Sequence, residues 1–384
     1  MNILTLNKIS PVGTNEFDSN YIVTDSCETP DAIMVRSAAM HDMDMPQSLL
    51  AIARAGAGVN NIPVEKCAEK GIVVFNTPGA NANAVKELAI ASLLLASRDI
   101  IGGIQWAKTL TGDDVAKQVE KGKSNFAGHE ITGKTLGVVG LGAIGVNVAN
   151  SAHKLGMKVL GYDPYISLKS AWNLSSHVCK AADLDDVYAN CDIICIHAPL
   201  TAETKHFINA ESIAKMKDGV IIINLSRADL VNDDDIETAL NDGKVAKYIT
   251  DFPNAKTIAM KNCISIPHLG ASTEESEDNC AYMAAHELID YLENGNIVNS
   301  VNYPNVEMPK TSAMRVCICH KNVPNLLSNI STVISSQGVN ISNMINKSKG
   351  DYAYTMIDCD DHLSDEIAKV LSDIEAVVRV RIIK

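Results

Sequence analysis

The sequence is short of basic charge and of long apolar runs. It holds 33 lysines and arginines against 46 aspartates and glutamates, which gives a formal net charge of −13. Such a chain is poorly suited to nonspecific binding of nucleic acid or acidic membranes, both of which need a basic surface. No uninterrupted apolar run is long enough to cross a bilayer. Any anionic substrate must therefore be met by a few local arginines and lysines.

Targeting and metal-binding patterns are also missing. The first eight residues are typical of an opening strand and lack the basic, apolar and small-residue order of a signal peptide, so we expect a cytoplasmic protein. The ten cysteines form no CxxC pair and no Cys/His spacing of a metal site. We therefore expect buried free thiols in a reducing compartment, and no bound metal.

One stretch carries a nucleotide-binding pattern. The apolar run 135–139 leads into glycines at 140, 142 and 145, and a segment of helical period follows to residue 155. These glycines allow a tight turn, close approach of a pyrophosphate and close packing of helix on strand. One strand further on, Asp163 can bond the ribose hydroxyls and would repel a 2′-phosphate. The pattern predicts a dinucleotide domain that prefers NAD to NADP.

The rest of the chain indicates an α/β protein of three domains. Residues 1–77 alternate short apolar strands with helical and polar linkers, and the pattern after Asp163 alternates strand and helix in the doubly wound manner. A helix from 272 to 295 can pack back on the first unit, which makes that unit discontinuous. The predicted domains are residues 1–80 with 269–302 for substrate, 81–268 for NAD, and 311–384 at the C-terminus.

Three further segments have predicted structures. Residues 83–110 have the pattern of a long, mostly apolar helix interrupted at Gly102–Gly103, and 121–128 have the composition of a loop. Prolines cluster in 302–310, which predicts a linker. The last seventy-odd residues follow the order βαββαβ of a ferredoxin-like fold.

Two strand ends carry residues suited to oxidation of a 2-hydroxy acid. Arg227 follows one predicted strand, and His268 follows the last strand of the nucleotide domain. The reaction needs a base for the hydroxyl proton and a fork of donors for the carboxylate. Taken alone, the histidine is more often a structural residue and the arginine a surface ion-pair residue.

Context favours the functional interpretation, because residues 55–295 resemble the D-2-hydroxyacid dehydrogenases. The matching motifs are 137–145, 197–201, 224–231 and 267–273. The resemblance implies that Arg227 holds the carboxylate and polarises C2, that His268 is the acid/base, and that Asp251 lies on the nicotinamide side. It implies cofactor contacts at Gly140, Gly142, Ala143, Ile144, Gly145, Asp163, His197, Pro199 and Asp251. It implies substrate contacts at Arg36, Ser37, Ala57, Gly58 and Asn81.

The C-terminal module resembles an ACT domain, a small-molecule regulatory unit. Joined to this dehydrogenase core, it implies NAD-dependent oxidation of D-3-phosphoglycerate to 3-phosphohydroxypyruvate, the first step of L-serine biosynthesis. The resemblance also implies L-serine as an effector held between paired modules by His320, Asn322 and Asn340. Because ACT domains pair and the long helix is apolar, we expect a homodimer or homotetramer.

Two departures from the family pattern bear on function. Residues 251–262 contain no glutamate, whereas most of the family has one there to orient the histidine. We expect another carboxylate or a water to replace it. Asn325 stands where ACT loops commonly have glycine, and asparagine tolerates a left-handed φ better than most residues. The alternatives are a glyoxylate or hydroxypyruvate reductase, or a non-catalytic NAD sensor on the same scaffold.

Overall fold

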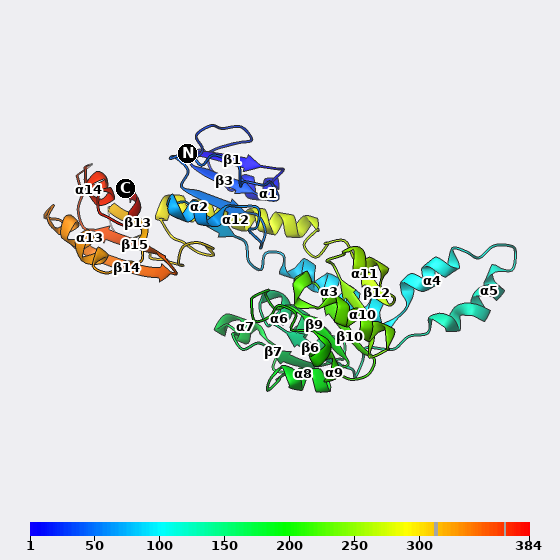
Figure 1. Cartoon of the computed structure of the whole chain (residues 1–384). Coiled ribbons are helices and arrows are strands. Elements are labelled where there is room, and N and C mark those ends of the chain that lie inside the picture. Colours follow the sequence, from blue (N-terminus) through cyan, green and yellow to red (C-terminus); the bar gives the residue numbers. More distant parts are fainter. Residues whose placement is uncertain (311–313, 365) are drawn as a thin grey trace. The chain divides into compact units, whose positions relative to one another are not determined.

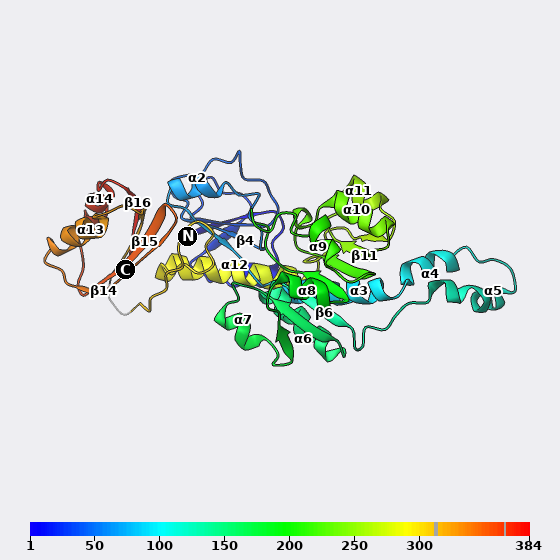
Figure 2. The ribbon, with the colours of Figure 1, turned by 60° about the horizontal axis from the view of Figure 1, so that its bottom comes forward.

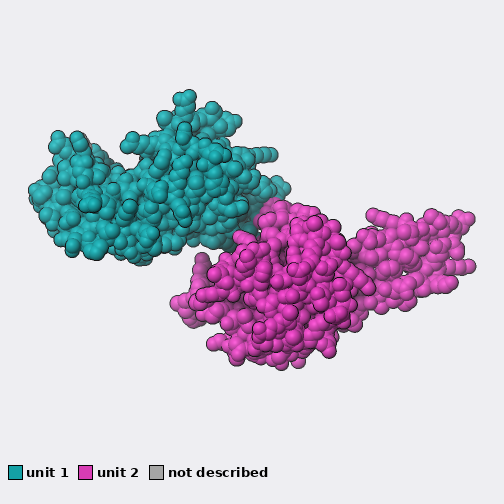
Figure 3. Space-filling view, in the orientation of Figure 1, with its two compact units in different colours: residues 1–81, 274–384 teal, residues 82–273 magenta. Residues whose placement is uncertain are grey.

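The chain forms two compact units. The computed structural model describes residues 1–310, 314–364 and 366–384, so the predicted start of the third domain at residue 311 lies outside the described residues. Residues 1–81 and 274–384 make the first unit, and residues 82–273 make the second (Figure 3). The C-terminal module thus shares a unit with the first α/β segment.

The first unit begins with a five-stranded parallel sheet of order β2-β1-β3-β4-β5. Its strands are β1 (Asn2–Leu6), β2 (Ile22–Thr24), β3 (Ala32–Val35), β4 (Ala51–Arg54) and β5 (Val73–Asn76), and its short helices are α1 (Pro11–Thr14) and α2 (Val64–Glu69). The predicted return helix is α12 (Glu274–Asn294), which packs against β4 and α1 (Figure 2). A Cβ at Gly13 would clash with Ala281, so the glycine lets α1 and α12 touch. The prediction of a discontinuous α/β unit is confirmed.

The second unit is a seven-stranded parallel sheet of order β12-β11-β10-β9-β6-β7-β8, with apolar side chains buried on both faces. Its strands are β6 (Thr135–Val139), β7 (Lys158–Tyr162), β8 (Val178–Lys180), β9 (Ile193–Ile196), β10 (Val220–Asn224), β11 (Val245–Thr250) and β12 (Cys263–Ser265). Its helices are α3 (Ala82–Ser97), α4 (Ile100–Ala107), α5 (Val115–Gly122), α6 (Ala143–Lys154), α7 (Leu168–Asn173), α8 (Leu184–Asn190), α9 (Ala210–Ala214), α10 (Asp233–Asn241) and α11 (Ala255–Ala259), with 3₁₀ turns η1 (Lys123–Phe126) and η2 (Ala228–Leu230). The predicted doubly wound nucleotide domain is confirmed.

Two predicted details of this unit are wrong. The long helix breaks at Arg98–Asp99, where the Asp99 carboxylate caps α4, and Gly102–Gly103 lie inside α4. The N-cap bond outweighs the helix-weakening effect of two glycines. The predicted loop 121–128 begins inside α5 and continues as η1. Figures 1 and 2 show α4 and α5 projecting away from the sheet of their unit.

The C-terminal module has the predicted ferredoxin-like order. It consists of β13 (Met314–Lys321), α13 (Leu326–Ser335), β14 (Ile341–Lys349), β15 (Tyr352–Cys359), α14 (Ile367–Ser372) and β16 (Val377–Ile383). The four strands form an antiparallel sheet of order β14-β15-β13-β16. Asn325 has a φ of 64° at the start of α13, so it adopts the left-handed conformation expected of it.

Residues 302–310 are not the free linker that their prolines suggested. Tyr303 and Val306 are fully buried, and the Tyr303 hydroxyl donates to Ala68 O at 2.8 Å. The buried Arg315 guanidinium binds the Asp358 carboxylate at 2.6 and 2.9 Å and also donates to three carbonyls of 294–309. This clamp and a shared apolar core fix the C-terminal sheet on the first sheet and α12, within the first unit.

The structure also bears on the cysteines and on membrane-spanning helices. All ten cysteines are unpaired, and seven of them are buried. Within the described ranges, the structure holds no helix both long enough and apolar enough to span a membrane.

Candidate active site

The glycine-rich turn after β6 leaves room for a ligand. Gly140 has a φ of 93°, and a Cβ there would lie 2.6 Å from the carbonyl carbon of His197. A Cβ at Gly145 would clash with Gly140 O, so α6 packs directly on the turn. By contrast, nothing lies within 4 Å of a Cβ position on Gly142, the N-cap of α6. Open space in front of free helix amides fits the pyrophosphate of a dinucleotide.

Asp163 holds this turn in place at the end of β7. Its carboxylate accepts from the backbone N–H groups of Leu141 and Tyr165, each at 2.8 Å. The predicted ribose acid thus lies beside the turn, where its charge acts on the same ligand. Ala143 and Ile144 form the first turn of α6.

His197 and Pro199 follow β9, whose end lies against the glycine turn. The Nε2 atom of His197 lies 3.1 Å from Cys195 Sγ, and burial lowers the pKa of the ring to about 4. The ring is therefore neutral at pH 7. Its Nδ1 atom is buried and has no hydrogen-bond partner among the described residues, so it is available to a ligand.

Three neighbouring strands deliver the predicted chemical groups. Because β10, β11 and β12 are adjacent and parallel, their carboxyl ends lie along one edge of the sheet. Arg227 follows β10, Asp251 follows β11 and His268 follows β12. The topology alone thus brings a cation, a carboxylate and an imidazole to one edge.

Asp251 links these groups electrostatically. It is 1% exposed, and burial raises the pKa of its carboxyl group, while the charge of His268, the N–H of Gly270 and the charge of Arg227 oppose that rise. Its Oδ1 atom has no hydrogen-bond partner in the part of the chain that is described. The charges of Asp251 and His268 therefore act on each other, and which group replaces the absent glutamate stays a prediction.

The flanking residues hold Arg227 and His268 in position. The side chain of Asn224 donates to Arg227 O at 2.8 Å and accepts from Ser226 N at 3.1 Å, which fixes the turn after β10. The Phe252 ring lies 4.8 Å from the His268 ring, centroid to centroid. The sequence prediction missed Phe252, although its place directly after Asp251 was a usable signal.

The predicted substrate residues of the first unit lie at the carboxyl ends of β3 and β4. Arg36 pairs with Glu277 at 2.6 Å, and both side chains are partly exposed. The backbone N–H of Ser37 donates to Asn7 Oδ1 at 3.1 Å. Arg54, the last residue of β4, donates from Nε to Arg36 O at 3.0 Å.

The loop after β4 carries the other predicted substrate residues. The Arg54 guanidinium lies over Gly56, whose φ is 154°. Asn76 donates to Ala57 O at 2.5 Å, which fixes the backbone just before Gly58. Asn81 lies at the start of α3 and ends the first segment of this unit.

The three predicted effector residues do not meet within one chain. His320 is 3% exposed and bonds to Lys321 O and to the Thr355 hydroxyl, each at 2.8 Å, and burial lowers the pKa of its ring. Asn322 lies near it and donates to Gly350 O. The strand registers place Asn340 at the opposite end of the sheet, where it donates to Asp360.

Comparison with known proteins agrees with this geometry. Residues 90–270 match the family model described as "D-isomer specific 2-hydroxyacid dehydrogenase, NAD binding domain". The match covers the glycine turn and the three strand ends, and it confirms the predicted cofactor class, NAD.

Two curated relatives and one solved structure illustrate the similarity. A hydroxypyruvate reductase of Thermotoga maritima is 39% identical over 259 residues, which are 64% of this chain and 80% of the relative. A D-3-phosphoglycerate dehydrogenase of Archaeoglobus fulgidus is 35% identical over 287 residues, which are 72% of this chain and 52% of the relative. The NAD⁺-bound 3-phosphoglycerate dehydrogenase of Entamoeba histolytica is 26% identical with a TM-score of 0.58, covering 79% of this chain and 98% of that one. The chain spans about half the length of several of the curated relatives it matches.

Proposed function

The chain belongs to the D-isomer specific 2-hydroxyacid dehydrogenase family, and from that premise we propose that it oxidises D-3-phosphoglycerate to 3-phosphohydroxypyruvate with NAD. One observation carries the proposal: Arg227, Asp251 and His268 end three adjacent strands of the sheet that carries the open glycine turn. A 2-hydroxy acid dehydrogenase requires this set of a carboxylate-binding cation and a base beside a nicotinamide.

NAD fits the residues that the second unit provides. The amides at the start of α6 and the space at Gly142 suit its pyrophosphate, and Asp163 suits its adenosine ribose. Asp251 Oδ1, which has no partner among the described residues, is an acceptor suited to amide or hydroxyl donors of the cofactor, and His197 Nδ1 can donate or accept according to the tautomer of the ring. When bound, NAD supplies the acceptor for the hydrogen and electron pair that leave C2 of the substrate.

The protein's own groups handle the charge and the proton. Arg227 holds the substrate carboxylate by charge-assisted hydrogen bonds and draws electron density from C2. His268 takes the proton of the C2 hydroxyl as the C–H bond breaks, and returns it in the reverse direction. Asp251 stabilises the imidazolium that forms, because it is buried and its charge interacts with that of His268.

The phosphate of the substrate calls for a further cation. Arg36 and the backbone at Ser37 lie at a carboxyl end of the first sheet, and Arg54 adds a second guanidinium there. We assign the phosphate to Arg36 and Ser37, and the backbone of Ala57 and Gly58 to the carboxylate. The relatives named D-3-phosphoglycerate dehydrogenase support this choice of substrate.

A second candidate substrate is hydroxypyruvate or glyoxylate, favoured by the 39% identity with a hydroxypyruvate reductase. Consumption of NADH should be measured with 3-phosphohydroxypyruvate, hydroxypyruvate and glyoxylate side by side. The proposal predicts a kcat/KM at least about tenfold higher for the phosphorylated substrate, since a phosphate on an arginine adds charge-assisted bonds. A preference for either unphosphorylated acid would replace the proposal with the second candidate.

Regulation by L-serine requires a second copy of the chain. His320 and Asn322 lie at one end of the C-terminal sheet and Asn340 at the other, so a site built from all three needs Asn340 of a second module. Strand β14 is at the edge of that sheet and is largely exposed, which leaves it free to pair. Inhibition by millimolar L-serine that is lost in Asn340→Ala would support this assignment, and unchanged turnover at that concentration would refute it.

Helix α4 supports assembly into a homodimer or homotetramer. No α4 residue is buried, and Ile100, Ile101 and Ile104 are 46%, 37% and 51% exposed. Three neighbouring isoleucines on a projecting helix form an apolar face that a second copy can cover. Sedimentation of wild type beside Ile104→Glu would test this face, and an unchanged mass would count against it.

A further inference from the structure

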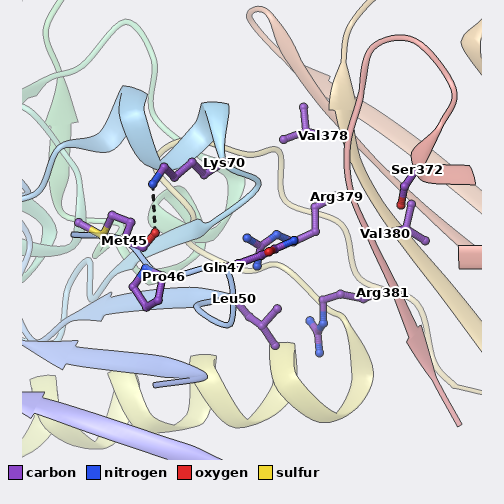
Figure 4. Close-up of a pocket in the computed structure, with 10 residues that line it drawn as sticks. All are labelled: Met45, Pro46, Gln47, Leu50, Lys70, Ser372, Val378, Arg379, Val380 and Arg381. Carbon is purple, nitrogen blue, oxygen red and sulfur yellow. Dashed lines mark hydrogen bonds between the residues drawn. The ribbon is translucent and has the colours of Figure 1, made fainter. Parts of the chain in front are cut away.

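A pocket of about 530 Å³ lies within the first unit, between the first sheet and the C-terminal sheet. Its walls come from the loop before β4, from the turn between α2 and β5, and from β16 with the end of α14. Figure 4 shows Gln47, Lys70, Ser372, Arg379 and Arg381 around this space. The pocket therefore joins segments that are more than 300 residues apart in the sequence.

The pocket carries positive charge without matching acid. Lysine and arginine supply three of its side chains, and none of the described residues lining it is an aspartate or glutamate. Lys70 Nζ donates to Met45 O at 3.0 Å, and Arg379 Nη1 donates to Leu49 O at 2.6 Å. Both partners are neutral carbonyls, so the two charges are not neutralised by these bonds. Each side chain has further N–H donors for a ligand.

Arg381 lines the pocket, but its guanidinium is held by neighbouring groups. Its guanidinium lies 4.5 Å from the centre of the Tyr291 ring and donates to Tyr291 O and Leu292 O at 3.2 and 2.9 Å. It also borders a neighbouring hollow that contains Asp18 and Glu293. Arg379 and Lys70 are therefore the two cations most available to a ligand.

The backbone is shaped to bring Arg379 against the turn of Lys70 and Gly71. Gly71 directly follows Lys70 and has a φ of 67°. A Cβ at Gly71 would lie 2.6 Å from the Cβ of Arg379, so only glycine lets β16 approach the turn this closely. The juxtaposition of Arg379 and Lys70 is thus a built feature of the fold.

The pocket is not on the edge where the proposed substrate residues lie. The loop 46–50 and Lys70 precede β4 and β5, so they mark the amino ends of these parallel strands. Arg36, Arg54 and the loop of Gly58 follow the carboxyl ends. The two edges are opposite, which separates this pocket from the substrate residues of the same sheet.

We propose that this pocket is a second small-molecule site that binds a small anion bearing a phosphate group. An arginine fork and a lysine, with the Gln47 amide beside them, suit the oxygens of a phosphate. Because its walls come from both sheets, the bound anion stabilises the docked arrangement of the C-terminal module. This inference does not depend on the reaction proposed above.

The test uses inorganic phosphate as the probe on the full-length protein, at constant ionic strength and with saturating NAD. The midpoint temperature of thermal unfolding of the wild type should rise with the logarithm of the phosphate concentration above the Kd. The concentration at which this rise begins should increase at least about tenfold in Arg379→Gln and in Lys70→Gln, because each loses charged hydrogen bonds. Lys369→Gln removes a charge from exposed α14 outside the pocket and should behave as the wild type.

The variants also separate this pocket from other phosphate sites. Should Arg379→Gln fail to fold, Lys70→Gln decides the matter, since Lys70 is an exposed residue at the end of α2. A logarithmic rise that survives in both pocket variants and disappears in Arg36→Gln would place the phosphate at the substrate edge and overturn the proposal. A rise that is linear in phosphate concentration and equal in wild type and variants would overturn it as well.

Discussion

The two parallel sheets of this chain have the same construction but different ligand-facing edges. The second sheet presents groups with unmet bonding capacity at its carboxyl edge: Asp251 Oδ1, His197 Nδ1 and open space at Gly142. At the matching edge of the first sheet, Arg36 is paired with Glu277 and Arg54 donates to Arg36 O. Under the proposed function, the same kind of sheet serves chemistry in the second unit and charge recognition in the first.

Apart from His268, the largest expected effect is at Arg227. Arg227→Gln removes the charged guanidinium from the second sheet, so kcat/KM with 3-phosphohydroxypyruvate should fall about 100-fold. The kcat/KM of Arg227→Lys should lie between those of Arg227→Gln and the wild type. Steady-state kinetics and NADH titration check this, with exposed Arg98→Gln as the control. A loss in NADH affinity that matches the loss in kcat/KM would mean that Arg227 serves the cofactor instead.

A smaller effect is expected at Asp251. In the reductive direction His268 donates its proton, so a fall in rate on acidification reports the loss of the Asp251 charge. Because burial raises the pKa of Asp251, this acidic limb should lie above the usual range of an aspartate. Asp251→Asn should lower the plateau rate about tenfold and abolish the limb. An unchanged pH profile in Asp251→Asn, beside Asp218→Asn as control, would show that Asp251 does not support His268.

A substitution at the carboxyl edge of the first sheet should change substrate binding rather than turnover. Arg36→Gln is expected to raise the KM for 3-phosphohydroxypyruvate about three- to tenfold and to leave the KM for hydroxypyruvate nearly unchanged. The effect is modest because Arg36 is partly exposed and already paired with Glu277. A large loss of kcat would contradict this division of roles between the sheets, since it would place chemistry at the first sheet.

The smallest effect concerns Glu287, a buried carboxyl group on α12. Burial raises its pKa from 4.5 to about 8, although Asn299 donates to it at 2.8 Å. The folded chain keeps this proton where the unfolded chain has lost it, so stability falls as pH rises from about 4.5 to about 8. Glu287→Gln should flatten this dependence and gain at least about 1 kcal/mol at pH 8 over wild type. Denaturant unfolding at several pH values gives the free energy of unfolding of both proteins. If the two free energies change with pH in parallel, the prediction is contradicted.

Periodicity and glycine spacing were enough to predict the fold class. The strand, turn and helix around Gly140 and the C-terminal βαββαβ order are local patterns, and strand order then placed Arg227 and His268 at one edge. The prolines of 302–310 misled the prediction because burial of Tyr303 and the Arg315 clamp depend on distant partners. The cation pair of Arg379 and Lys70 was missed for the same reason.

The central claim is that the second sheet performs the chemistry through His268 without the glutamate usual in the family. The most direct measurement is NADH consumption with 3-phosphohydroxypyruvate by wild type and by His268→Ala, with NADH binding measured on both. We expect turnover in the wild type and a rate of NADH consumption at least about 100-fold lower in His268→Ala, with NADH binding retained. Equal turnover in both proteins, or none in a wild type that binds NADH, would contradict it.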